Sequence, residues 1–557
     1  VIGVFFLALI GIIVWVVRQK QNDSADYFLG GRDATWLAIG ASIFASNIGS
    51  EHLIGLAGAG ASSGMAMAHW EIQGWMILIL GWVFVPFYTR SMVYTMPEFL
   101  ERRYNPQSRT ILSVISLVSY VLTKVAVTVY AGGLVFQQVF GIKELWGIDF
   151  FWIAAIGLVV LTALYTIFGG MKSVLYTSVL QTPILLLGSL IILVLGFKEL
   201  GGWDEMMRVC GAVTVNDYGD TMTNLIRSND DANFPWLGAL IGSAIIGFWY
   251  WCTDQFIVQR VLSGKNEMEA RRGTIFGAYL KLLPVFLFLI PGMIAFALHQ
   301  KYIGAGGEGF LPMLENGTAN ADAASPTLVA KLLPAGVKGL VVCGILAALM
   351  SSLASLFNSS AMLFTIDFYK RFRPQTSEKK LVGIGQVATV VIVILGILWI
   401  PIMRSVGDVL YTYLQDVQSV LAPGIAAAFL LGICWKRTSA QGGMWGLISG
   451  MVIGLTRLGA KVYYSNAGEV ADSTFKYLFY DMNWLFFCGW MFLFCIIVVI
   501  VVSLATEAPT AEKIQGLVFG TATKEQKAST RASWNHWDII HTVIILAITG
   551  AFYWYFW

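Results

Sequence analysis

The segment FASNIGSEHLIG, residues Phe44–Gly55, places polar and ionisable side chains inside an otherwise apolar stretch. The flanks TWLAIGASI and LAGAGASSGMAM are apolar enough to belong to a helix that spans a membrane. Asn47, Glu51 and His52 lie at the centre, among glycines. Ionisable side chains at membrane depth are costly and usually serve function. This segment therefore predicts both the class of fold and the position of a site.

The composition of the whole chain indicates an integral membrane protein. Of the 557 residues, 57% are hydrophobic and only 12% are charged, and the mean hydropathy is +0.70. Too few charges are present to cover a water-soluble globule of this size. Apolar runs of about 20 residues predict about 14 transmembrane helices. They lie near residues 1–18, 34–63, 66–90, 109–138, 147–168, 173–197, 235–262, 272–299, 334–367, 381–402, 407–434, 440–461, 483–504 and 535–557.

The distribution of Lys and Arg predicts the orientation of these helices. Most basic residues fall in alternate connections, and the positive-inside rule then places both termini outside. We therefore expect a multi-pass protein of the plasma membrane or the bacterial inner membrane. The net charge of +3 is explained by this orientation and indicates no nucleic-acid partner. The sequence sets no expectation for the oligomeric state.

Two segments interrupt their own helical pattern in a similar way. One is the stretch around residues 46–50, and the other is GFWYWCTDQ at residues 247–255. Four more predicted spans follow each of them. Interrupted helices at matching positions of two halves indicate an inverted-repeat transporter, whose site lies beside the breaks. The predicted units are an extra helix at residues 1–20, five-helix repeats at 34–197 and 235–434, and three C-terminal helices at 440–557.

Five sets of polar side chains fall at membrane depth. They are Asn47, Glu51 and His52; Glu71 with Gln73; Trp249, Tyr250, Trp251, Asp254 and Gln255; Lys281; and Gln415, Asp416 and Gln418. Amides, a carboxylate, an ammonium and aromatic rings together suit a neutral polyhydroxylated ligand, because sugars carry many hydroxyl groups and apolar ring faces. The alternative is structural: Glu71 and Lys281 form an ion pair, and the glutamines bind helix backbones.

A second signal is the serine-rich segment AALMSSLASLFNSS. Ser351 and Ser352 are adjacent hydroxyls, and Ala348 lies one helical turn before them. Together with backbone carbonyls of Ala45 and Ile48 at the first break, they offer hard oxygen ligands for a small cation. The alternative is a face of small residues for close helix packing.

Long motifs in this chain resemble the sodium/glucose cotransporters of the sodium:solute symporter family. These motifs are FASNIGSEHLIGLAGAG, YTMPEFLERRY, LYTIFGGMKSVLYTSVLQT, WYWCTDQFIVQRVLSGKN, YLKLLP, SSLASLFNSSAMLFTIDFYK and LAPGIAAAFLLGICWKR. The resemblance covers residues 25–440. It implies the all-α leucine-transporter fold, with two broken helices and alternating access.

The resemblance also implies roles for particular residues. Sodium, the co-transported ion, is expected at Ala45, Ile48, Ala348, Ser351 and Ser352. Sugar is expected at Asn47, His52, Glu71, Lys281 and Gln415, with Tyr250 as the inner gate and with Leu56, Trp70 and Tyr411 as the outer gate. Trp251, beside Tyr250, is predicted from its polar set to contact the sugar as well. No organic cofactor is expected.

The chain departs from the family pattern at two positions. Ser178 stands where family members usually have a carboxylate, and Ala354 stands where members that couple two sodium ions have a hydroxyl. Because both groups would be ligands of a second cation, we predict one sodium ion per sugar.

The leading hypothesis is import of a hexose, glucose or galactose, driven by the sodium gradient. Symport of an inositol, a sialic acid or an amino acid is the alternative on the same fold. A sugar-gated sensor or ion leak is a second alternative, and Gln415 argues against it because sensor-like relatives have glutamate there. An enzyme is not expected, because the sequence contains no Ser-His-Asp or His-rich metal pattern.

Overall fold

The computed structural model describes residues 1–19, 23–49, 51–314, 317–403, 410–466 and 471–557. In these residues the chain is almost wholly helical, and each of the predicted membrane stretches contains helix. A short antiparallel hairpin pairs β1 (Glu144–Leu145) with β2 (Ile148–Asp149). The predicted all-α membrane fold is confirmed.

The helices follow the chain in three groups. The first contains α1 (Ile2–Arg18), α2 (Ser24–Leu29), α3 (Trp36–Asn47), α4 (Ala57–Ser63), α5 (Ala68–Glu71), α6 (Gly74–Ile79), α7 (Val85–Ser91), α8 (Met96–Arg103), α9 (Pro106–Ser119), α10 (Ala126–Phe140), α11 (Phe150–Leu200) and α12 (Trp203–Gly211). The second contains α13 (Trp236–Gly247), α14 (Gln255–Leu262), α15 (Glu267–Lys281), α16 (Ile290–Gly304), α17 (Ala324–Leu332), α18 (Ala335–Met362), α19 (Lys370–Phe372), α20 (Glu378–Met403) and α21 (Leu410–Cys434). The third contains α22 (Ala440–Asn466), α23 (Thr474–Lys476), α24 (Trp484–Ala505), α25 (Ala511–Ile514), α26 (Lys524–Ala532) and α27 (His536–Tyr555).

Short π-helical and 3-10 segments join several of these helices. The π-helices are η2 (Glu51–Leu56), η4 (Leu80–Phe84), η5 (Tyr120–Val125), η6 (Phe248–Thr253), η7 (Val285–Leu289), η9 (Leu363–Tyr369) and η10 (Tyr477–Asp481). The 3-10 helices are η1 (Gly30–Arg32), η3 (Gly64–Met67) and η8 (Ala321–Ala323). A π-turn shifts the backbone hydrogen bonds by one residue. Such turns often occur at functional positions inside helices.

Both predicted breaks are present. Helix α3 ends at Asn47, Ile48 is extended with φ −81° and ψ 95°, and helix resumes at Glu51. In the second break, η6 ends at Thr253 and Asp254 is extended with ψ 128°. The Asp254 carboxylate then accepts a hydrogen bond from the backbone N–H of Phe256 and so caps α14.

Helix α11 combines two predicted spans. Gly170 inside it has φ 53° and ψ −149°, which is not a helical conformation, so the chain turns sharply between residues 147–168 and 173–197. A side chain is disfavoured at positive φ, and a methyl group at Gly170 would also meet the backbone of Tyr27. Glycine is therefore required at this turn.

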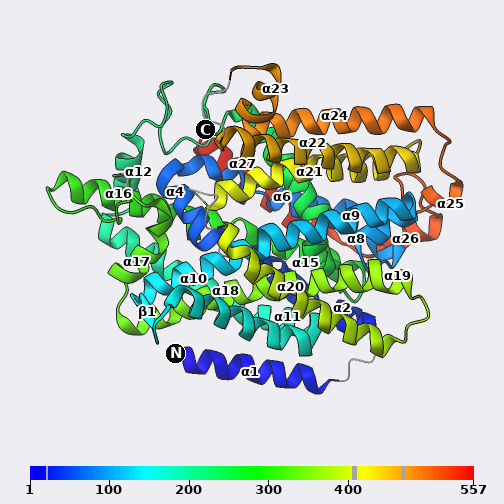
Figure 1. Cartoon of the computed structure of the whole chain (residues 1–557), viewed down its shortest axis with the longest axis horizontal. Coiled ribbons are helices and arrows are strands. Elements are labelled where there is room, and N and C mark those ends of the chain that lie inside the picture. The colour runs from blue at the N-terminus through cyan, green and yellow to red at the C-terminus, as the bar shows by residue number, and fades with distance from the viewer. Residues whose placement is uncertain (20–22, 50, 315–316, 404–409, 467–470) are drawn as a thin grey trace.

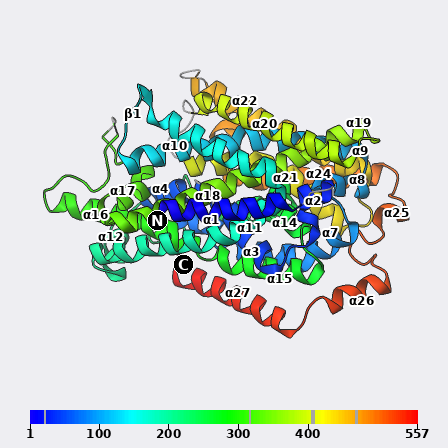
Figure 2. The same cartoon turned by 90° about the horizontal axis from the view of Figure 1, so that it is seen from below.

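The helices run side by side, and their axes are roughly horizontal in Figure 1. Within the bundle, α3 packs against α11, α15 and α18, whereas α21 packs against α22 and α24. Figures 1 and 2 place both termini at the end that carries α12 and α16, opposite α19 and α25. Both termini therefore lie at the same end of the helix bundle. That this end is the outer one stays a prediction.

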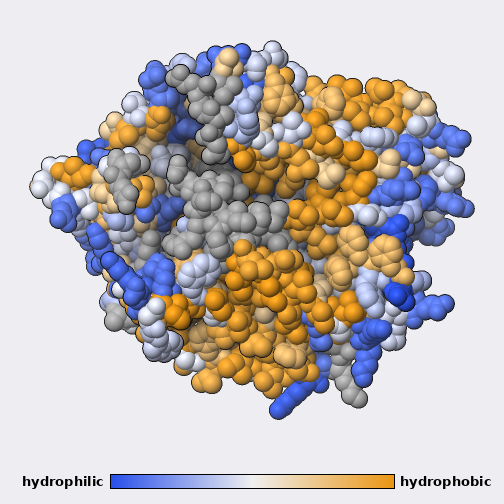
Figure 3. Space-filling model, in the orientation of Figure 1, coloured by the Kyte–Doolittle hydropathy of each residue, from blue (hydrophilic) through white to orange (hydrophobic). Residues whose placement is uncertain are grey.

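The surface matches a bilayer. Figure 3 shows apolar side chains across the middle of this face and hydrophilic ones toward both ends. Among the described residues, nine helical runs are long and apolar enough to cross a membrane. Some are central, such as Gly336–Phe372 with 89% of its apolar window buried, and others are peripheral, such as His536–Tyr555 with 22%. The peripheral helices present their apolar surface to lipid.

Close packing of α4 against α16 depends on glycine. A methyl group at Gly292 would overlap the carbonyl oxygen of Ala57, and one at Gly60 would overlap that of Leu289. Helices in a membrane associate largely through such close backbone contact.

We predict that Gly292→Ala destabilises the protein by about 1–3 kcal/mol, because the added methyl group forces α4 and α16 apart. Gly304→Ala in the same helix is the matched control, since its methyl group would meet no atom within 4 Å. Thermal unfolding of the purified protein in detergent measures both. Equal midpoints for the two variants would contradict this account of the packing.

Candidate functional site

A cavity of about 390 Å³ lies beside the two breaks. It is lined by Asn47, Glu51, His52, Trp70, Glu71, Gln73, Ile246, Gly247, Tyr250, Trp251, Lys281, Leu414, Gln415 and Gln418. Every residue that the sequence predicted to bind substrate is among them.

A chain of polar contacts crosses one wall of this cavity. Lys281 Nζ donates to Glu71 Oε2 at 2.7 Å and to Asn47 Oδ1 at 3.1 Å. Asn47 Nδ2 in turn donates to the Tyr250 hydroxyl at 3.1 Å. His52 Nε2 lies 3.2 Å from Glu71 Oε2. The structural ion pair considered from the sequence therefore exists, and it lies in the cavity wall.

This pairing has an electrostatic consequence. Lys281 and Glu71 are each at most 4% exposed, so either charge alone would be strongly disfavoured. Together they cancel, and their remaining hydrogen-bonding positions border the cavity. This wall is therefore suited to a neutral ligand with many hydroxyl groups.

Aromatic rings and amides also line the cavity. Trp251 Nε1 donates to Gln73 Oε1 at 3.2 Å, and Gln73 Nε2 donates to the carbonyl of Ser243 at 2.7 Å. A methyl group at Gly247 would lie 2.5 Å from Gln73 Oε1, so this glutamine fills the space beside the glycine. The Tyr250 and Trp251 rings meet edge to face with centroids 4.9 Å apart. They offer apolar surface to a sugar ring.

The predicted gate residues have different surroundings. Trp70 lines the cavity and stacks on Trp484 with centroids 5.5 Å apart. Tyr250 lines the cavity from the second broken helix. Leu56 is fully buried and is not among the described residues that line the cavity. The side chain of Tyr411 lies outside the described residues.

The predicted cation ligands lie where α18 meets the first break. All of them are buried, namely Ala45, Ile48, Ala348, Ser351 and Ser352. Ser352 Oγ donates to the carbonyl of Ser46 at 2.8 Å, and the Ser46 and Ser355 hydroxyls are 2.7 Å apart. Ser351 Oγ lies 3.3 Å from Ser178 Oγ, so hydroxyls from α11 and α18 meet here. The serine-rich face is thus in contact with the unwound backbone.

A second cavity, of about 290 Å³, adjoins the first. The two share Glu51, Tyr250, Leu414 and Gln418 in their linings. Lys124 lines the second cavity and forms a 2.6 Å ion pair with Asp254, which also accepts a hydrogen bond from the Tyr120 hydroxyl. Its ammonium lies 4.7 Å from the ring centroid of Tyr250 and therefore supports this predicted gate.

Lys124 is not among the residues that the sequence predicted to be functional. It is the single charged residue in the apolar run YVLTKVAVTVY, and the rule for charged residues at membrane depth would have singled it out. Its pairing with Asp254, by contrast, depends on contact between distant segments.

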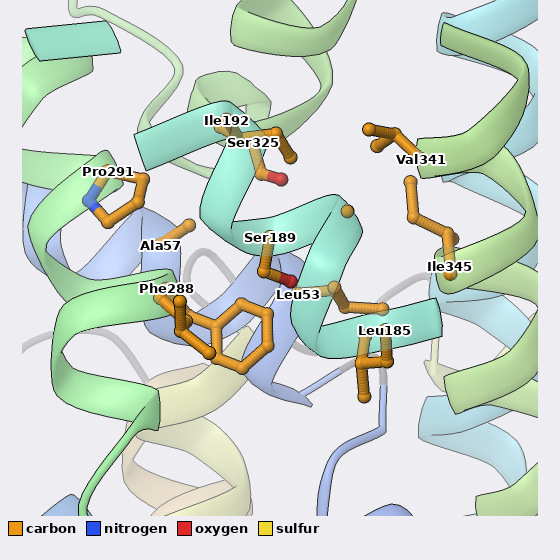
Figure 4. A pocket seen from close by; sticks show the side chains of 13 residues that line it. Leu53, Ala57, Leu185, Ser189, Ile192, Phe288, Pro291, Ser325, Val341 and Ile345 are labelled. Atoms are coloured by element: carbon orange, nitrogen blue, oxygen red, sulfur yellow. The ribbon is translucent and has the colours of Figure 1, made fainter. Parts of the chain in front are cut away.

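A third cavity, of about 360 Å³, lies behind the first broken helix. Figure 4 shows its mostly apolar lining, which includes Leu53, Ala57, Leu185, Phe288 and Ile345. Ser189 and Ser325 are the polar side chains among its described lining residues. A polyol would leave hydroxyl groups unpaired there, so the cavity at the breaks is the better candidate site.

Comparison with known proteins agrees with this geometry. The family model described as "Sodium:solute symporter family" matches residues 27–450. The human sodium/myo-inositol cotransporter 2 is 37% identical over 535 residues, which cover 94% of this chain and 78% of the relative. The zebrafish (Danio rerio) sodium/glucose cotransporter 4 is 36% identical over 564 residues, covering 96% and 82%.

A solved structure is similar in fold. It is the substrate-bound outward-open state of a Na⁺-coupled sialic acid symporter, with a TM-score of 0.71, 22% identity, and coverage of 91% of this chain and 98% of that one. This confirms the leucine-transporter type of fold. The chain therefore belongs to the sodium:solute symporter family, and it is a sodium-coupled transporter of a small solute rather than an enzyme.

Proposed function

We propose that this protein imports a neutral cyclic polyol together with sodium, and that the polyol is a hexose, glucose or galactose. The observation that carries the proposal is the cavity in which Lys281 is neutralised by Glu71 while Asn47 and Gln415 offer amides. Rings of Tyr250 and Trp251 supply the apolar faces against which a sugar ring packs.

A second candidate is myo-inositol, because several relatives at 36–37% identity carry the name sodium/myo-inositol cotransporter. Inositol is also a neutral six-membered ring with hydroxyl groups, so the same wall would suit it. A carboxylated solute such as a sialic acid or an amino acid is less well matched. No arginine is present among the described residues that line the cavity, and Lys281 already has a carboxylate partner.

Coupling is proposed to arise at the cation site. Sodium held by the carbonyls of Ala45 and Ile48 and by Ser352 would join the first break to α18. A cation that favours one arrangement of these elements changes solute affinity in the adjoining cavity. One sodium ion per solute is expected, because Ser178 lacks the carboxylate and Ala354 lacks the hydroxyl that the family resemblance implies for a second site.

Alternating access is proposed to follow from two repeats, residues 34–197 and 235–434, with one helix before and three after them. Each repeat contains one of the breaks, so movement of one repeat against the other would open the cavity to either side. The termini and α12 would lie outside the cell in a plasma or inner membrane.

Uptake into proteoliposomes tests the substrate. We expect labelled glucose or galactose to enter when an inward sodium gradient is applied and not when potassium replaces sodium, with one positive charge carried per sugar. Sodium-driven uptake of myo-inositol alone would replace the hexose by the second candidate. Sodium currents without uptake of any polyol would indicate a leak or a sensor and would contradict the proposal.

Gln415→Ala should weaken solute binding, because a buried hydroxyl of the solute would lose its partner at a cost of about 1–3 kcal/mol. The solute concentration for half-maximal uptake should therefore rise about 5- to 150-fold. Gln386→Ala, on α20 and outside the cavity lining, is the control. If the two variants needed the same solute concentration for half-maximal uptake, Gln415 would not be a ligand of the solute.

Ser352→Ala should raise the sodium concentration needed for half-maximal uptake more than it weakens solute binding at saturating sodium. The reason is that it removes a hydroxyl ligand from the cation site alone. Ser449→Ala on α22, where the hydroxyl donates to the carbonyl of Gly446 and to Cys495 Sγ on α24, is the matched control, since it lines neither of the two adjoining cavities. Sodium titrations of uptake at fixed solute concentration measure the effect. An unchanged sodium titration for Ser352→Ala would exclude the proposed cation site.

A further inference from the structure

Glu51 occupies a special position between the two cavities. It is the first residue of η2, directly after the unwound turn, and it lines both the 390 Å³ cavity and the adjoining 290 Å³ cavity. The neighbouring residue His52 lies beside Glu71 in the wall of the larger cavity. Glu51 itself borders the smaller cavity together with Ser352 and Lys124.

Both lysines that line these cavities are paired with a carboxylate. Lys281 is paired with Glu71 at 2.7 Å, and Lys124 is paired with Asp254 at 2.6 Å. In the part of the chain that the structure describes, no basic side chain forms an ion pair with Glu51. A carboxylate in such surroundings is strongly disfavoured unless a cation accompanies it.

The surroundings of Gly49 show that the Glu51 carboxylate and the Ser352 hydroxyl lie close together. A methyl group on Gly49 would overlap Oε2 of Glu51 and would lie 2.8 Å from Oγ of Ser352. These two side chains thus fill the space beside Gly49 and bring a carboxylate oxygen near a hydroxyl oxygen. Oxygens of these two kinds are preferred ligands of hard cations.

Arg260 makes a negative group necessary in this region. Its Nε donates to Ser46 Oγ at 3.2 Å, and the Ser46 carbonyl accepts the hydrogen bond from Ser352. A permanently charged guanidinium therefore lies next to the candidate cation ligands, all of which are neutral oxygens. Repulsion from Arg260 would weaken sodium binding there unless a nearby carboxylate offset it.

We propose that Glu51 is a further ligand of the cation site and supplies its negative charge beside Ser352, with which it lines the smaller cavity. The inference rests on the proposed cation site at the first break. Two unit charges about 5 Å apart at an effective dielectric constant of about 20 change a binding constant by more than about tenfold. Glu51 thereby sets the sodium concentration at which the transporter operates.

Binding of radioactive sodium to the purified protein without solute tests this inference. Glu51→Gln keeps the shape of the side chain and removes its charge, and we expect it to raise the sodium concentration for half-saturation at least about tenfold. Glu51→Asp keeps the charge and should restore part of the affinity. Glu205→Gln, at a partly exposed carboxylate of α12 that pairs with Arg208 far from the two breaks in the sequence, is the control and should bind sodium like the wild type.

The outcomes separate this inference from the proposed function. Wild-type sodium binding by Glu51→Gln would overturn the inference, even where polyol uptake proves sodium-driven. A lower solute affinity of that variant at saturating sodium, with unchanged sodium binding, would assign Glu51 to the solute. Loss of sodium affinity in a protein that transports no polyol would support the inference and reject the proposed solute. Where Glu51→Gln does not fold, Gly49→Ala should displace the Glu51 carboxylate, which its methyl group would overlap, and should also weaken sodium binding.

Discussion

The structure depends on what happens to backbone groups that are freed inside a membrane. Helix α3 ends at Asn47, Ile48 is extended, and helix resumes only at Glu51. Carbonyl groups released there have no water to bind in the hydrocarbon region, so they can persist only in contact with polar partners or a cation. Ser352 on α18 reaches the Ser46 carbonyl at 2.8 Å and supplies one such partner. The break therefore brings together polar groups from segments far apart in sequence.

The second break completes the arrangement from the other side. Asp254 caps α14 and is held by Lys124 and Tyr120 from η5, which places the Tyr250 ring between the two polar cavities. A solute beside Tyr250 and a cation beside Ser352 would thus be separated by little more than the break between α3 and η2. This closeness is the physical basis for coupling, since each ligand would bias the same pair of broken helices.

Much of this could be predicted from the sequence, because the signals lie within short stretches of the chain. Apolar runs gave the helices, and the glycine and polar residues of FASNIGSEHLIG marked the first break because each departs from a continuous apolar helix. The lining of the cavity followed from intramembrane polar residues and the family resemblance. Distances and pairings could not be predicted, because they depend on contacts between distant helices. The Lys124–Asp254 pair, the packing of Gln73 into the space beside Gly247, and the joining of two spans into α11 through Gly170 are of this kind.

The central claim is that sodium and a neutral polyol bind to two adjoining sites that are coupled to each other. Equilibrium binding of the transported polyol to the purified protein, with and without saturating sodium, tests it most directly, alongside sodium binding with and without the polyol. Linkage requires that sodium tighten polyol binding and that the polyol tighten sodium binding by the same factor, which we expect to be about 5- to 150-fold. Polyol affinity that does not change with sodium would contradict the account.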